Sequence, residues 1–449
     1  MSAAFSAGEQ LTVSLSGNGT GAVTSTPVGI NCPSTCSAAF PPNTQVALTE
    51  TPSTNDSFAS WSGDCSGTTS CVLTLAATSS VTANFTTANS GGGNFSATAL
   101  VYVANATSGT NNEVQAFSAD PSGQLTSVSG SPFQVNAAYM TATGRYLFTT
   151  DGTNIYSYSV ASDGSITQAS SINPNDNNAS PCGSPLSLFL DRTGATLYGL
   201  DYVSDCANNQ YEAFSIDPAT GALKFVGITT AASPVFNRPL SFIGDDQFGY
   251  SASCYHYIQE IYGFRRNSDG SLTLVSNLGA APPMPQPPAG DTYCPWLAAA
   301  DTSNHEAVTL SAMNIYSFQA DGATQIAVYT VDASGNLSTN STSSDMPRVA
   351  VGNVTDMQMS PAGNYLAVAG TGLQIFNFNG ANPVTQLTGL LTNAPIDQIA
   401  WDNANHLYAI SKSANQLFVF TVSSSGADAA PGSPYTISSP VNIAVLPGP

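Results

Sequence analysis

The sequence predicts an all-β protein, a seven-bladed β-propeller preceded by a small β domain. Short runs such as residues 155–160 alternate apolar and polar side chains, and turns rich in Gly and Asp separate them. This alternation is typical of antiparallel strands joined by tight hairpins. From residue 98 onward the pattern repeats at spacings of roughly 40 to 65 residues, as expected of propeller blades.

Composition narrows the functional classes. The chain has 449 residues, of which 42% are hydrophobic and only 8% are charged, and its net charge is −20. An acidic surface repels nucleic acids and anionic lipid headgroups, so neither is expected as a partner. No apolar run reaches the roughly 20 residues of a membrane helix, so no transmembrane segment is expected. No basic, apolar signal segment opens the chain, and we expect that any export signal is absent from it.

The first domain is expected over residues 1–87. Alternating strands are predicted at residues 11–15, 46–49, 58–63, 72–75 and 80–85, with Trp61 in the core. Two close cysteine pairs, Cys32–Cys36 and Cys65–Cys71, lie in Ser/Thr-rich turns. Zinc binding is the alternative, but no histidine precedes His256, so we favour disulfides and an oxidising location.

The motifs of this domain resemble a known family. They are Gly-x-Gly-x-Val at 19–23, Cys-x3-Cys at 32–36, Phe-x-x-Trp-Ser-Gly-x-Cys at 58–65 and Val-Thr-Ala-x-Phe at 81–85. Together they resemble the divergent B-repeat domain of internalin-type bacterial surface proteins, over residues 9–87. The resemblance implies a spacer or adhesive module without catalytic residues. A flexible linker is expected at 88–97, because it contains three consecutive glycines.

The ring is expected over residues 98–449. Turn signatures mark its units at residues 120–123, 162–164, 217–221, 268–270 and 332–335, with weaker ones at 379–380 and 425–426. The first unit begins at 99–103 with a second-strand pattern, whereas the chain ends at 441–446 with an innermost-strand pattern. We therefore expect the C-terminal strand to close blade one, which removes exposed sheet edges. Six or eight blades are the alternatives to seven.

Three phrases of this region resemble a second family. They are Tyr-Val-Ala-Asn at 102–105, Gly-Ser-Pro-Phe at 130–133 and Asp-Pro-x-x-Gly-x-Leu at 217–223. They are similar to phrases that recur in the seven-bladed lactonase-like propellers. The resemblance implies the fold more strongly than an activity, because these residues form turns and strands.

The predicted propeller fold indicates where the four later cysteines lie. In a propeller, the loop before each innermost strand and the loop between its second and third strands lie on one face. Cys182, Cys206, Cys254 and Cys294 all fall in such loops, which predicts the disulfides Cys182–Cys206 and Cys254–Cys294. They would constrain the longest loops, on the face where propellers usually bind ligands.

A catalytic set can be sought on this face. Lactone-hydrolysing members of the family carry a Gly-Pro-Arg-His phrase, whereas this chain has Asn237-Arg238-Pro239-Leu240 and keeps only the arginine. Their early His-x-His phrase is replaced by residues 136–139. A lactonase needs a general base and a cation for the developing oxyanion. Arg238 is the candidate cation, and His256 or Glu260 the candidate base.

Other residues offer weaker indications. His256 is equally a loop histidine packed among tyrosines, and His305 and His406 are expected to be solvated turn residues. Side chains near the same face would suit a sugar or peptide, although core packing explains most aromatic ones; the candidates are Tyr139, Asn237, Arg238, Tyr255, Tyr257, Tyr293 and Trp296. No metal site or cofactor is expected; calcium at 173–178 is the alternative, without the usual loop spacing.

The sequence therefore favours an exported, cell-surface or secreted protein with a non-catalytic role. It would act as a scaffold that binds a protein or carbohydrate, or that assembles with further copies of itself. The alternative is a hydrolase of a neutral or carboxylated lactone. The enzyme requires Arg238 and a base to converge in the central pocket, whereas a binder does not.

Overall fold

The computed structural model describes most of the chain as two compact units. The described residues are 8–16, 21–53, 56–65, 71–87, 97–106, 113–135, 137–174, 187–201, 210–230, 238–255, 258–275, 284–314, 320–381 and 383–448. Unit 1 is Met1–Gly93 and unit 2 is Asn94–Pro449. All named elements are strands, which confirms the all-β prediction. None of the described segments forms a helix that could span a membrane.

Unit 1 consists of two four-stranded sheets. The first has the order β4 (Ser37–Phe40), β1 (Glu9–Ser16), β8 (Ser79–Thr87) and β6 (Asp56–Gly63); the second has the order β3 (Asn31–Cys32), β2 (Gly21–Thr26), β5 (Thr44–Pro52) and β7 (Cys71–Leu75). All five predicted strands are present. The sequence analysis missed β2, β3 and β4, which are short and carry little apolar alternation.

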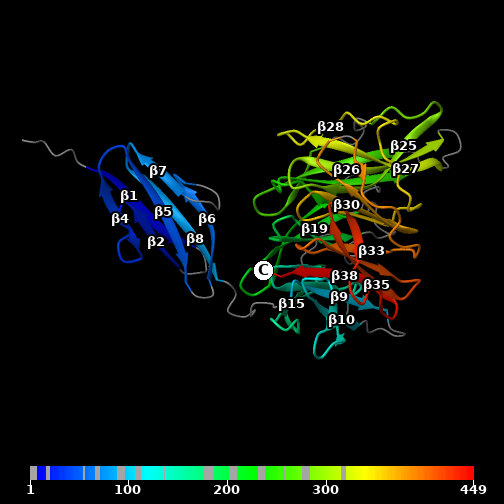
Figure 1. The fold of residues 1–449 in the computed structure, drawn as a ribbon, viewed down its shortest axis with the longest axis horizontal. Coiled ribbons are helices and arrows are strands. Elements are labelled where there is room, and N and C mark those ends of the chain that lie inside the picture. Colours follow the sequence, from blue (N-terminus) through cyan, green and yellow to red (C-terminus); the bar gives the residue numbers. More distant parts are fainter. Residues whose placement is uncertain are drawn as a thin grey trace, which may run out of the picture. The chain divides into compact units, whose positions relative to one another are not determined.

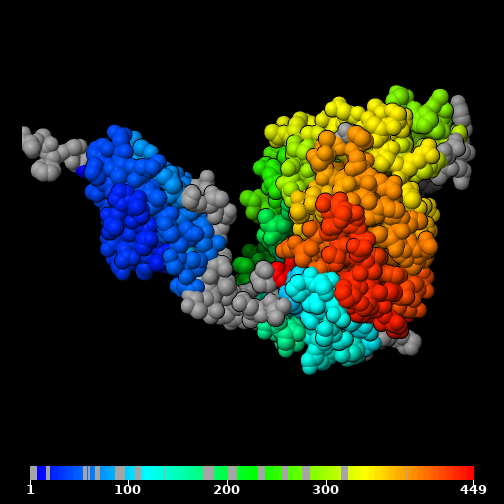
Figure 2. Space-filling model, in the orientation of Figure 1, coloured from blue at the N-terminus to red at the C-terminus, as the bar shows by residue number. Residues whose placement is uncertain are grey.

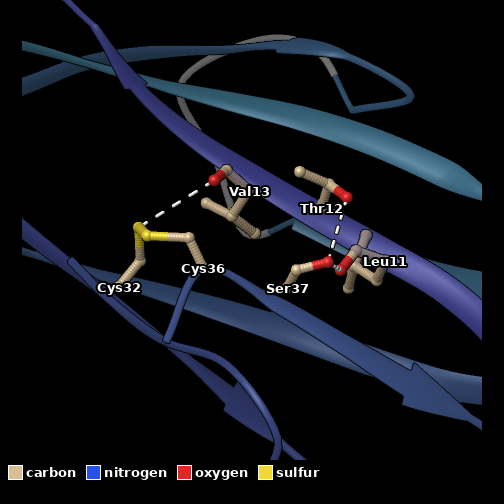
Figure 3. The surroundings of a disulfide bond; sticks show 6 residues. All are labelled: Leu11, Thr12, Val13, Cys32, Cys36 and Ser37. Carbon is tan, nitrogen blue, oxygen red and sulfur yellow. Dashed lines mark hydrogen bonds between the residues drawn. A yellow bond between two sulfur atoms is a disulfide. The ribbon is translucent and has the colours of Figure 1, made fainter. Parts of the chain in front are cut away.

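The core of unit 1 is small and is supported by its disulfides. Trp61 is only 2% exposed and its ring lies 4.9 Å from that of Phe58, which confirms its core position. The Cys32–Cys36 and Cys65–Cys71 disulfides are both present, as predicted. Figure 3 shows the Cys32–Cys36 bridge against β1, with the Cys32 sulfur 3.9 Å from the Val13 carbonyl oxygen.

Unit 2 is a β-propeller whose described residues form seven sheets, called blades 1 to 7 here in chain order. Blade 2 comprises β13 (Tyr139–Thr143), β14 (Tyr146–Thr150), β15 (Ile155–Val160) and β16 (Ile166–Ile172); blade 3 β17 (Ser187–Leu190), β18 (Thr196–Asp201), β19 (Gln210–Ile216) and β20 (Leu223–Thr230); blade 4 β21 (Ser241–Phe242), β22 (Phe248–Tyr255), β23 (Ile258–Arg266) and β24 (Leu272–Leu274). Blade 5 comprises β25 (Asp291–Ala300), β26 (His305–Asn314), β27 (Ala320–Val331) and β28 (Leu337–Thr339); blade 6 β29 (Asp356–Met359), β30 (Tyr365–Gly370), β31 (Gly372–Asn377) and β32 (Thr385–Gln386); blade 7 β33 (Gln398–Trp401), β34 (His406–Ser411), β35 (Gln416–Ser423), β36 (Gly426–Ala429) and β37 (Tyr435–Thr436). The first strand listed for each blade is its innermost strand.

Blade 1 is completed by the C-terminal strand. It contains β9 (Ala99–Asn105), β10 (Glu113–Ala119), β11 (Leu125–Ser127) and β12 (Phe133–Gln134), and its innermost strand is β38 (Pro440–Pro447). β38 pairs antiparallel with β9, as Figure 1 shows in red beside cyan. In Figure 2 the cyan surface of blade 1 accordingly lies against the red surface of the last blade. The predicted closure of the ring is confirmed.

The seams between blades explain the repeated turn signatures. The Tyr102 hydroxyl of blade 1 donates to the carbonyl of Gly164, in the outer turn of blade 2, at 2.9 Å. Tyr198 reaches Gly270 in the same way at 2.7 Å, and Tyr250 reaches Gly335 at 2.8 Å. Each turn glycine therefore belongs to a contact with the preceding blade as well as to its own hairpin.

At the seam that closes the ring, a histidine packs against the turn glycine. His406 of blade 7 packs against Gly123 of blade 1, where an added Cβ would lie 3.0 Å from the imidazole and φ is +79°. His406 is 1% exposed and its Nδ1 lies 2.7 Å from Asp402, so the expectation of a solvated turn residue is wrong. His305 is partly exposed and lies 2.8 Å from Asp301. His406 is buried by the neighbouring blade, and this contact could not be predicted from the residues next to His406 in the sequence.

Candidate ligand site at the channel mouth

The innermost strands surround a central cavity of about 640 Å³. All seven blades contribute to its wall. The polar side chains that matter most lie where innermost strands begin, so they share one mouth of the channel. The end where the innermost strands begin is called the channel mouth below.

Arg238 is held at the mouth just before β21. Its backbone carbonyl accepts a hydrogen bond from the buried Tyr211 hydroxyl at 2.6 Å. Its guanidinium carbon lies 4.5 Å from the ring centroid of Trp296, a cation–π contact. Burial lowers the pKa of Arg238 and the charge of Asp356 opposes that shift. An arginine remains charged under such conditions, so the mouth holds a fixed positive charge.

Trp296 lies beside Arg238 at an irregularity in β25. The pairing register with β26 shifts between Pro295 and Ala298, so Trp296 lies in a β-bulge. Bulges re-aim side chains beside functional sites. The indole N–H donates to the carbonyl of Val354 at 3.1 Å, and 37% of the residue is exposed. The indole is thus fixed in place while part of its ring stays accessible.

Asp356 is an acidic residue that lines the same cavity as Arg238. It was not among the site residues predicted from the sequence. It is the first residue of β29 and accepts hydrogen bonds from the backbone N–H groups of Met357 at 2.8 Å and Ile399 at 2.9 Å. Burial raises the pKa of Asp356 to about 6, although these hydrogen bonds and Arg238 act in the opposite direction. An acid at the first position of an innermost strand, on the side of Arg238, is the signal that would have identified it.

Exposed apolar side chains lie on the mouth side of the ring, and this set is called the rim below. Among the described residues of unit 2, the large hydrophobic residues that stand out as exposed are Tyr139, Trp296 and Leu390. Tyr139 begins β13, and Leu390 lies next to Gly372 in the turn that follows β30, on the side where Asp356 begins β29. Exposed apolar groups gathered at one opening are characteristic of a binding surface.

A disulfide constrains the same side of the ring. Cys254 in β22 is bonded to Cys294 in β25, as predicted, and joins blade 4 to blade 5. Cys294 is close in sequence to Trp296, so this bond limits the movement of the strand that carries the indole. The other predicted bond, Cys182–Cys206, lies outside the described residues.

The structure brings together only some of the predicted site residues. Arg238, Trp296 and Tyr139 lie at the mouth, as described above. Tyr293 is 1% exposed and its hydroxyl donates to Gln325 at 3.3 Å, so it belongs to the core of blade 5. Three candidates, Asn237, His256 and Tyr257, are outside the described residues; Tyr255 and Glu260 are placed by their backbone alone, in β22 and β23.

No metal cluster is formed by the part of the chain that the structure describes. Groups of three or more His, Cys, Asp or Glu side chains with a suitable arrangement do not occur there. Most of the segment 173–178, the alternative calcium site, is outside those residues. The chemistry of the described mouth therefore rests on an arginine, the carboxyl groups of Asp356 and Asp397, and aromatic rings.

Comparisons with known proteins identify the fold of the ring. No protein-family model and no curated protein matches the chain. The periplasmic gluconolactonase of Pseudomonas aeruginosa is 14% identical with a TM-score of 0.56, covering 78% of this chain and 99% of its own. Putative 6-phosphogluconolactonases of Bacteroides fragilis (14% identical, TM-score 0.55, 77% and 97% covered) and Bacteroides uniformis (13%, 0.57, 77% and 99%) are also similar. At such identity the likeness shows the fold alone, and unit 2 has the fold of the lactonase-like β-propellers.

Proposed function

We propose that unit 2 binds a lactone at the channel mouth and hydrolyses it. The observation that carries this proposal is that Arg238 and Asp356, a cation and a carboxyl group whose pKa is raised to about 6, line the same cavity. The sequence favoured a non-catalytic scaffold unless Arg238 and a base converged. Their convergence reverses that order and replaces His256 and Glu260 with Asp356 as the candidate base.

The two side chains have complementary roles in such a reaction. The Asp356 carboxylate accepts a proton from water as the water oxygen attacks the lactone carbonyl carbon. The Arg238 guanidinium stabilises the oxyanion that forms on the carbonyl oxygen. The ring C–O bond then breaks, and the leaving alkoxide takes the proton from Asp356. The product is a hydroxy acid, which releases one proton to solvent.

The charge of the cavity limits the substrate class. Arg238 is the one Lys or Arg among the described residues that line it. A phosphate group is usually held by several cationic side chains or by backbone N–H groups at a helix N-terminus. The described mouth offers neither, so the proposed substrate is a neutral or singly carboxylated lactone.

Ligand binding without catalysis is the second candidate. The rim of Tyr139, Trp296 and Leu390 favours it, since an exposed apolar rim serves binding whether or not a reaction follows. Three disulfides indicate a protein that resides in an oxidising environment outside the cytoplasm. Placement at the cell surface, with unit 1 as a B-repeat-like spacer, is part of this proposal.

Proton release in a pH-stat tests the hydrolase directly. The panel contains valerolactone, gluconolactone and galactonolactone, with the wild-type chain, Arg238→Ala, Asp356→Asn and, as a control, Arg145→Ala. Arg145 donates to the carbonyl of Ala219 outside the cavity. We expect kcat to fall about 10²–10³-fold in Arg238→Ala and about 10²–10⁴-fold in Asp356→Asn, and to be unchanged in the control.

The pH profile provides a second readout. The carboxylate form of Asp356 is the active base, so the rate should rise as the pH increases through about 6 and then level off. Asp356→Asn should abolish this rise. Absence of turnover on every lactone, or equal losses in Arg238→Ala and Arg145→Ala, would reject the hydrolase and leave binding as the function to pursue.

A further inference from the structure

A second cavity lies beside the channel mouth. Its volume is about 320 Å³, and it is lined by Trp296, Ser311, Thr324, Asn353 and Val354. We propose that this cavity is a subsite for a neutral sugar ring. The inference rests on the proposed function and deepens it by assigning a substrate class, a lactone that carries a sugar ring as a separate group, but its own evidence concerns the second cavity.

Trp296 supplies the apolar platform of the subsite. The Arg238 guanidinium lies over the indole, so the opposite face is the one left for a ligand. The indole N–H is already bonded to Val354, so the ring offers its face and not its donor. The C–H groups of a pyranose form a flat apolar surface of similar size, which packs well on such a face.

Two hydroxyl groups supply the polar side of the subsite. Ser311 on β26 and Thr324 on β27 are register partners, and their hydroxyl oxygens are 2.8 Å apart. Each hydroxyl can donate one hydrogen bond and accept others, so the pair can serve adjacent hydroxyl groups of a sugar. The exposed residue Asn353 adds an amide. No charged side chain lines this cavity among the described residues, which favours an uncharged, hydroxylated ligand.

Trp296 also connects the subsite to the proposed reaction centre. It lines the second cavity, and Arg238, which lies over its ring, lines the first. Cys294 of the interblade disulfide is the register partner of Ser311, so the same bond restrains both the indole and the hydroxyl pair. A ligand that occupies both cavities would place its sugar ring next to the group held by Arg238.

Tryptophan fluorescence can report on this subsite. The chain has three tryptophans: Trp61 is buried in unit 1, Trp401 lines the first cavity and Trp296 lines the second, so the part of a ligand-induced change that is lost in Trp296→Phe arises at the second cavity. The full chain is titrated with methyl glucoside, methyl galactoside, methyl mannoside, cellobiose and maltose, and each Kd is repeated by calorimetry. We expect saturable binding of at least one saccharide. Trp296→Ala should weaken it about tenfold or more, and Trp296→Phe should retain part of it.

Further variants separate the subsite from the catalytic proposal. Ser311→Ala and Thr324→Val should each weaken saccharide binding several-fold, whereas Asp356→Asn should leave it unchanged while removing turnover. Saccharide binding without lactone turnover would reject the hydrolase and keep the subsite. Lactone turnover with no saccharide binding, or wild-type affinity in a folded Trp296→Ala or Ser311→Ala protein, would overturn the subsite.

Discussion

The two ends of the innermost strands use acidic residues in opposite ways. Where these strands begin, Asp356 faces the cavity and shares it with Arg238. Where they end, Asp191 and Asp402 are fully enclosed by donors from their own turns and from neighbouring strands. The difference shows that a buried carboxyl group becomes a candidate for chemistry when it faces a cavity and the surrounding donors do not offset the cost of burying its charge.

Asp402 is an example of an acid with a structural role, at the end of an innermost strand. Its Oδ1 accepts the backbone N–H groups of Ala404 and His406 at 2.9 and 2.8 Å. Its Oδ2 lies 2.7 Å from the His406 imidazole and accepts the Tyr408 hydroxyl at 2.9 Å. Asp191 is similarly occupied, because Arg266 forms an ion pair with it at 2.7 Å. Such groups orient turns and seams and have no capacity left for a ligand.

The largest expected effect comes from removing the structural acid. Asp402→Ala should lower the free energy of unfolding by about 3–5 kcal/mol, because it leaves several buried donors unpaired. Asp356→Asn should change stability by less than about 1 kcal/mol, because the amide keeps the shape and removes a buried charge. Chemical denaturation measures both. Equal losses of unfolding free energy in the two variants would show that the acids at the two strand ends do not differ in their structural role.

Removing the Cys254–Cys294 disulfide should have the next largest effect on stability. The Cys254–Cys294 bond spans 40 residues and the Cys32–Cys36 bond spans four. Replacing the first pair by serines should destabilise unit 2 by about 2–4 kcal/mol, and replacing the second pair should cost unit 1 about half as much. Limited proteolysis and denaturation of each double variant test this. A smaller loss for the longer loop would contradict the idea that the bond rigidifies the mouth.

A matched pair of tyrosines sharpens the comparison. Tyr211 donates to the carbonyl of Arg238, and Tyr102 makes the same kind of bond to Gly164 at a seam. Both Tyr→Phe changes should lower stability by about 1 kcal/mol. Only Tyr211→Phe should also lower kcat on lactones, with KM and the pH profile little changed, because it positions the arginine. Equal kcat values in the two variants would remove Tyr211 from the site.

The smallest expected effect concerns a buried acid outside the mouth. Glu306 in β26 is fully buried, and burial raises its pKa well above the ordinary value. A raised pKa in the folded state means that the protonated group supports folding at low pH, and that this support is lost as the pH rises toward the raised pKa. Glu306→Gln should therefore flatten the decline of Tm as the pH rises above the ordinary glutamate pKa of about 4.5. An unchanged slope would show that Glu306 is compensated by its neighbours.

Much of the fold could be predicted because its signals are local. Period-two alternation, turn residues and the phase of the terminal strands are properties of neighbouring residues, and they led to the propeller, its closing strand and three disulfides that the structure contains. Arg238 and Trp296 could be proposed from their phrases. Asp356 could not, because its raised pKa follows from burial in the completed ring.

The chain's local pattern thus suffices for the propeller's strand order and turns, for five of the eight strands of unit 1 and for the acidic, weakly charged composition. The packing of blades against one another assigns the roles of individual side chains. His406 is buried because Gly123 of blade 1 closes over it, and Asp356 shares the central cavity with Arg238 because innermost strands from different blades begin at one mouth. Contacts between residues distant in sequence set burial and charge environment, and these two quantities separate a structural acid from a reactive one.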